Sequence, residues 1–67
     1  MMFNTRRWRQ LLLRAGFRLR RTNGGHARYA CGAINIDIPI HLRELSPNVV
    51  ASVRRALRAA GVGEVTP

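Results

Sequence analysis

The sequence predicts one small α+β domain in which two helices cover one face of a three-stranded antiparallel sheet. Three observations lead to this fold class. Apolar residues recur with a helical period near both ends of the chain, they alternate with polar residues in its middle, and glycine-rich turns separate the alternating segments. Two helices with one apolar stripe each are expected to bury those stripes against the same side of the sheet. Residues 1–67 are therefore interpreted as a single domain.

A first helix is expected over residues 5–15. Its apolar stripe follows the spacing i, i+3, i+4 and i+7 and consists of Trp8, Leu11, Leu12 and Ala15. Asn4 or Thr5 can cap the start, because both side chains accept hydrogen bonds from free backbone N–H groups. Gly16 stands where a residue in the left-handed conformation commonly ends a helix.

The first expected strand covers about residues 17–22, where the sequence period changes to two. One side of this strand would carry Phe17, Leu19 and Arg21, and the other Arg18, Arg20 and Thr22. Asn23, Gly24 and Gly25 follow, and these residue types tolerate the positive φ of a tight hairpin turn.

A strand expected at 34–40, after a second turn at Gly32, has the clearest alternation in the sequence. Its two sides would consist of Ile34, Ile36, Ile38 and Ile40, facing the helices, and of Asn35, Asp37, Pro39 and His41, facing away. Pro39 has no N–H to give to a neighbouring strand, so this end is expected at an edge or leaving the sheet. We expect the first three isoleucines to be buried.

The sequence of the middle strand, expected at 26–31, does not by itself show which of its side chains face the core. Tyr29 and Cys31 make a better core pair than His26 and Arg28, which assigns the latter two to the open face. That face would then consist of Arg18, Arg20, His26, Arg28, Asn35, Asp37 and His41. A polar, arginine-rich sheet surface with two histidines is interpreted as the functional surface.

A second helix is expected over residues 46–60. Ser46 is its N-cap and Pro47 occupies the first helical position, where a missing N–H does no harm. Its apolar stripe consists of Val49, Val50, Val53, Leu57 and Ala60. Gly61 is expected to close the helix.

Charge is the strongest guide to function. All twelve basic residues are arginines, against three acids, which gives a net charge of +9. This balance predicts attraction to nucleic acid, an anionic membrane or an acidic protein.

A single cysteine excludes an intrachain disulfide and is typical of the reducing cytoplasm. No apolar run is long enough to cross a membrane. The first twenty-two residues, rich in arginine and free of acids, leave a mitochondrial transit peptide open as an alternative.

His26 is the candidate general acid or base, because two glycines precede it and let a phosphate approach the backbone closely. The alternative is an ordinary exposed histidine at the start of a strand. His41 is expected in a loop, and Cys31 in the core rather than as a nucleophile. No spacing among these residues and Asp37 matches a known metal-binding pattern, so neither a metal nor another cofactor is expected.

Several segments carry a family resemblance through their order and spacing: Ala15-Gly16-Phe17, Gly24-Gly25-His26-Ala27-Arg28-Tyr29, Ile38-Pro39-Ile40-His41, Glu44-Leu45-Ser46-Pro47 and Arg58-Ala59-Ala60-Gly61-Val62. Over nearly the whole chain they resemble the HicA family of toxin ribonucleases. The resemblance implies a double-stranded-RNA-binding-domain-like fold of order α-β-β-β-α. It also implies a metal-independent endoribonuclease that cleaves mRNA, the toxin of a type II toxin–antitoxin system.

By the same resemblance His26 is the expected catalytic residue, with Gly24 and Gly25 as its lead-in. The remaining expected RNA contacts are Arg18, Arg20, Arg28 and His41, with the arginines holding the phosphate. An acidic HicB-like antitoxin is the implied protein partner, in the cytoplasm. A non-catalytic RNA- or DNA-binding module is the main alternative. A membrane-active cationic peptide is a weaker one, because such peptides are usually one helix.

Overall fold

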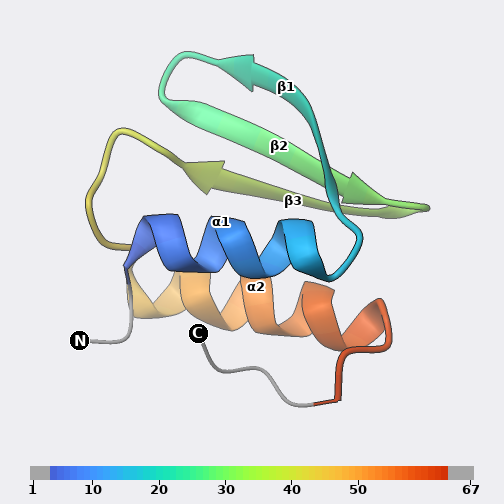
Figure 1. Ribbon diagram of the computed structural model, residues 1–67. Coiled ribbons are helices and arrows are strands. Elements are labelled where there is room, and N and C mark those ends of the chain that lie inside the picture. The colour runs from blue at the N-terminus through green and yellow to red at the C-terminus, as the bar shows by residue number, and fades with distance from the viewer. Residues whose placement is uncertain (1–3, 64–67) are drawn as a thin grey trace.

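The computed structural model describes residues 4–63 and has the predicted α+β architecture. Its elements are α1 (Thr5–Arg14), β1 (Arg18–Asn23), β2 (His26–Cys31), β3 (Ile34–Pro39) and α2 (Pro47–Ala59). The strands form one antiparallel sheet in the order β1-β2-β3, and both helices lie against one of its faces (Figure 1). Each predicted boundary lies within one residue of the observed one.

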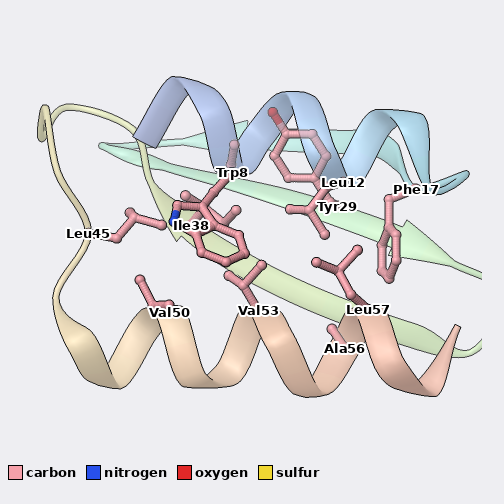
Figure 2. Close-up of a cluster of buried hydrophobic side chains, with 11 residues drawn as sticks. Trp8, Leu12, Phe17, Tyr29, Ile38, Leu45, Val50, Val53, Ala56 and Leu57 are labelled. Atoms are coloured by element: carbon pink, nitrogen blue, oxygen red, sulfur yellow. The ribbon is translucent and has the colours of Figure 1, made fainter. Parts of the chain in front are cut away.

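The core lies between the two helices and the sheet (Figure 2). Its fully buried members come from both helices and from β2, β3 and the first turn, and they are Trp8, Leu12, Phe17, Ala27, Tyr29, Ile38, Val53 and Leu57. Burying a side chain of leucine size stabilises a fold by ~1.5–3 kcal/mol. A domain this small has few such side chains, so the apolar stripe of each helix is needed to close the core.

Helix α1 begins and ends as its sequence predicts. The Asn4 side chain accepts a hydrogen bond from the Arg7 backbone N–H at 3.1 Å, so the first of the two predicted caps is the one used. Gly16 has a φ of 101°, and the next N–H, from Phe17, returns to the Leu12 carbonyl at 3.0 Å. This Schellman ending turns the chain from the helix into β1.

Helix α2 uses the same devices. The Ser46 hydroxyl accepts a hydrogen bond from the Val49 N–H at 3.3 Å, with proline at the first helical position. Gly61 has a φ of 94°, and the Val62 N–H donates to the Leu57 carbonyl at 3.0 Å. Both predicted stop glycines are therefore confirmed by their conformation.

The alternation predicted for β1 is wrong in its second half. Leu19 pairs with Tyr29, but Arg21 pairs with Arg28, so the register shifts and Arg20 is the extra residue of a β-bulge. Two residues of β1 then stand opposite one residue of β2, and the side chains beyond the bulge change sides. Arg21, expected on the helix-facing side, therefore lies on the open face opposite Arg28.

The isoleucines of β3 face the helices, as predicted, but only one of them is fully buried. Ile38 lies at the centre of the core, whereas Ile34 and Ile36 are partly covered and pack at its margin. Leu19, in the edge strand β1, is 47% exposed, and Cys31 is half-buried rather than central. Residues near the β2–β3 turn and in edge strands have fewer neighbours to cover them, which explains the difference.

The connection from β3 to α2 returns past the start of α1 (yellow in Figure 1). The Ile40 N–H donates to the Gly25 carbonyl at 2.7 Å, and the Thr5 N–H donates to the Arg43 carbonyl at 2.9 Å. Leu45 is buried at the far end of this segment. The loop that contains His41 is thus held at the β1–β2 turn, at α1 and in the core. No helix within residues 4–63 is long and apolar enough to cross a membrane.

Candidate nucleic-acid interface

The face of the sheet that the helices leave uncovered is built from three rows of paired residues. Across β1, β2 and β3 these rows read Arg18-Ala30-Asn35, Arg21-Arg28-Asp37 and Asn23-His26-Pro39. Every arginine in them is exposed. Most apolar side chains are directed to the opposite face by the period of two, so this surface is left mainly to polar groups, with Ala30 and Pro39 as the exceptions.

Arg28 and Asp37 form the one ion pair found within residues 4–63. The guanidinium donates from Nε to Oδ1 at 2.8 Å and from a terminal nitrogen to Oδ2 at 3.1 Å. These hydrogen bonds lower the pKa of Asp37 below its ordinary value and raise that of Arg28. Since both side chains are about half exposed, the pair orients Arg28 on the surface more than it stabilises the fold.

His26 lies in a surface hollow with arginines of two strands. The hollow is lined by Arg21, Asn23, His26, Arg28 and Asp37. A neighbouring hollow shares two of the arginines and is lined by Arg20, Arg21, Arg28, Ala30, Gly32 and Asn35. The bulge in β1 therefore adds Arg21 to the surface beside His26, next to Arg20 of the neighbouring hollow.

The structure brings His26 and His41 together at one end of the sheet, where β2 begins and β3 ends. Their ring centroids are 6.3 Å apart and the rings meet edge to face, at 63°. His41 Nδ1 lies 3.2 Å from the Gly25 carbonyl oxygen. A side chain at Gly25 would overlap the His41 ring, so the absence of a Cβ at this position is what admits the ring.

His41 also borders a third hollow, at the start of α1. This hollow is lined by Asn4, Thr5, Arg6, Arg9, Ile40, His41, Leu42 and Arg43. Arg9 is fixed there, because its Nε donates to the Tyr29 hydroxyl at 2.6 Å and its guanidinium lies 5.8 Å from the tyrosine ring centroid. The two histidines thus lie between an arginine group on the sheet and another beside α1.

The predicted site residues do not all meet. His26, Arg28, Gly25 and His41 lie together, and Arg20 lies in the adjoining hollow. Arg18 is in the row farthest from His26, and Gly24 serves the turn with a φ of 64°.

Sequence reasoning missed Arg21, Arg6, Arg9 and Arg43. Arg21 was hidden by the bulge. For Arg6 and Arg9 the sequence contains one signal of a shared basic surface, because they lie three positions apart and so share a helix face.

Among residues 4–63, no three His, Cys, Asp or Glu side chains lie close enough to hold a metal ion. Comparison of the chain with protein-family models, with curated proteins and with solved structures found no match.

Proposed function

We propose that this protein is a metal-independent endoribonuclease that cleaves mRNA in the cytoplasm, as the toxin of a type II toxin–antitoxin system. The observation that carries the proposal is an exposed imidazole, His26, in a surface hollow with the guanidinium groups of Arg21 and Arg28. An imidazole exchanges protons near neutral pH, and guanidinium groups bind and neutralise phosphate. The resemblance of the sequence to the HicA family supports the same activity.

The reaction needs proton transfer and charge stabilisation. The ribose 2′-hydroxyl attacks the adjacent phosphorus, the new O2′–P bond forms, and the bond from phosphorus to the 5′ oxygen breaks. His26 takes the proton from the hydroxyl or gives one to the leaving oxygen, a transfer that requires the imidazole to come within hydrogen-bond reach of that oxygen. Arg28, oriented by Asp37, stabilises the negative charge that develops on the phosphoryl oxygens.

RNA is the proposed substrate because the attack uses a 2′-hydroxyl, which DNA lacks. Binding by arginines alone is independent of base sequence and releases counterions from the phosphates. The logarithm of the RNA association constant should then fall with the logarithm of salt concentration, with a slope of ~−0.7 per contacted phosphate on a single strand.

The proposed protein partner is an acidic HicB-like antitoxin. A chain of net charge +9 attracts an acidic surface, and a partner that covers His26 would also block RNA. Co-expression with the product of the adjacent reading frame should give a stable complex without cleavage activity. A complex that leaves His26 accessible and cleavage undiminished would contradict this part of the proposal.

The decisive experiment replaces His26 by alanine. Because His26 is exposed, His26→Ala creates no cavity and should fold with an unchanged melting temperature. RNA affinity should stay within a few-fold, while cleavage should fall by ~10²–10⁴-fold and growth arrest should be lost. EDTA should leave parental cleavage unchanged, and a 2′-deoxy residue at the cleavage position should abolish it.

Thr22→Ala is the matched control. Thr22 is an exposed residue of the same hairpin, but it pairs with buried Ala27 and so lies on the other face. This variant should cleave at the parental rate. If His26→Ala cuts RNA as fast as the parent, the catalytic assignment is wrong. If neither the parent nor His26→Ala cuts RNA but both bind it, the protein is a non-catalytic RNA-binding module.

A further inference from the structure

We infer that His41 is a second catalytic residue of this site and that it transfers a proton in the role opposite to that of His26. The inference rests on the proposed ribonuclease function. Cleavage of a phosphodiester by its own 2′-hydroxyl needs one group that removes a proton and another that supplies one. The distance between the two histidines suits these two roles, because the centroids of their imidazole rings lie 6.3 Å apart. A proton-transfer group must lie ~2.6–3.2 Å from the atom it serves, so both rings can reach a single phosphate group placed at their edges.

The Gly25 carbonyl fixes which nitrogen of His41 is available. A carbonyl oxygen only accepts hydrogen bonds, so at 3.2 Å His41 Nδ1 must carry the hydrogen and donate it. Nε2 is then the nitrogen that is left to take up or release a proton. A backbone carbonyl on Nδ1 is a common means of setting the tautomer of a functional histidine.

The same carbonyl also fixes the position of the ring. It accepts a second hydrogen bond, from the Ile40 N–H at 2.7 Å, so the backbone just before His41 is tied to the β1–β2 turn. Gly25 has no Cβ, and the His41 ring occupies the place where one would stand. The turn that presents His26 therefore also positions His41, and the two rings are held relative to each other by one short piece of backbone.

Charged groups face both histidines. His26 faces Arg21, Arg28 and Asp37, and His41 faces Arg6, Arg9 and Arg43. A strand that crosses the two rings meets guanidinium groups on either side of the reacting phosphate. This arrangement favours cleavage within a chain over removal of a terminal nucleotide, because both flanking phosphates are bound.

In the reaction one neutral imidazole accepts the 2′-hydroxyl proton as the O2′–P bond forms. The other, protonated imidazole donates its proton to the 5′ oxygen as the P–O5′ bond breaks. The products are a 2′,3′-cyclic phosphate and a free 5′-hydroxyl, and no electrons are transferred between reactants. Two groups that must hold opposite protonation states give a rate that falls on both sides of an optimum pH.

The test compares His41→Ala, His41→Asn and His26→Ala with the parent. The asparagine side chain can still donate to the Gly25 carbonyl but cannot transfer a proton. We expect kcat/KM of the parent to be bell-shaped with pH, and each of the three variants to lose ~10²–10⁴-fold of the rate and one limb of the profile. Melting temperatures, measured in parallel, should show that all three variants fold.

A modified RNA then assigns the roles. Replacing the 5′ bridging oxygen at the cut by sulfur gives a leaving group that needs no proton, so it should restore cleavage to the variants of one histidine only. The inference is overturned if His41→Ala cuts like the parent, if His41→Asn keeps the parental rate, or if the sulfur substrate restores both histidine variants or neither. In those cases the ribonuclease proposal stands. A parent that cuts no RNA overturns both.

Discussion

The β1–β2 hairpin and the β2–β3 hairpin have turns of the same kind. Gly24 and Gly25 form the first turn, and Gly32 and Ala33 form the second. In each turn only the first residue has a positive φ, 64° at Gly24 and 62° at Gly32. This pattern belongs to the type II′ turn, whose twist matches that of the flanking strands.

The two hairpins differ in the regularity of their strand pairing and in the second residue of the turn. β2 and β3 pair without interruption, whereas β1 carries the bulge at Arg20. The second turn residue is an exposed alanine in one hairpin, and in the other it is Gly25, against which His41 packs. The first glycine of each turn is thus required by the backbone, and Gly25 by a neighbouring side chain. The irregular hairpin is the one that builds the candidate site.

The largest effect that separates the two turns is expected at their second position. In Gly25→Ala the new methyl group displaces the His41 ring, and cleavage should fall by ~10–10²-fold, the range expected when a catalytic group is misplaced. Folding should survive, because the exposed ring can turn into solvent. Initial rates and the imidazole NMR signals of His41 measure the effect. Ala33→Gly, the matched change in the other turn, should alter neither. A parental rate with unshifted signals in Gly25→Ala would contradict the role assigned to this glycine.

A smaller effect, equal in both hairpins, is expected at the first position. The methyl group added in Gly24→Ala or Gly32→Ala meets no other atom, so the loss of folding stability comes from the left-handed backbone alone. That conformation costs a residue with a side chain ~1–2 kcal/mol. Each variant should melt at least ~4 °C below the parent. Thermal unfolding of the two proteins measures this, and a turn that accepts alanine without loss would show that the two backbones are not equivalent.

The smallest effect is expected where the hairpins place different partners beside Arg28. Across β2–β3 it pairs with Asp37, and across β1–β2 it faces Arg21. Since Arg28 lowers the pKa of Asp37, the stabilisation is fully present above the pKa of an unfolded aspartate, ~3.9, and is lost as pH falls through the lower, folded value. Asp37→Asn should therefore melt slightly below the parent at pH 7 and 5, and the difference should shrink as pH falls below about 4 and vanish below the lowered pKa of Asp37. A difference that persists in acid would rule out this ion pair as its source.

The features that the sequence predicts well are local. The caps at Asn4 and Ser46, the stop glycines and the isoleucine alternation each depend on a few adjacent residues, and the structure confirms them. These signals were enough for the order of elements and for the face on which His26 lies. They did not require knowledge of any long-range contact.

The features that the sequence did not reveal depend on distant partners. From Arg18 to Asn23 the side chains are mostly polar, so no change in alternation marks the bulge. Gly24 and Gly25 look alike in the sequence, although Gly24 is needed for its positive φ and Gly25 for the space it leaves to the His41 ring. The approach of His41 to His26 follows from the hydrogen bonds of the loop, which only the assembled fold contains.

The loop that contains His41 is fastened to the first residue of α1, where the Thr5 N–H meets the Arg43 carbonyl. Its other end leads through buried Leu45 into α2, whose Val53 and Leu57 close the core. During synthesis the histidine pair therefore cannot form as the hairpin emerges. We expect the pair to be completed only when α2 has been made and packed against the core.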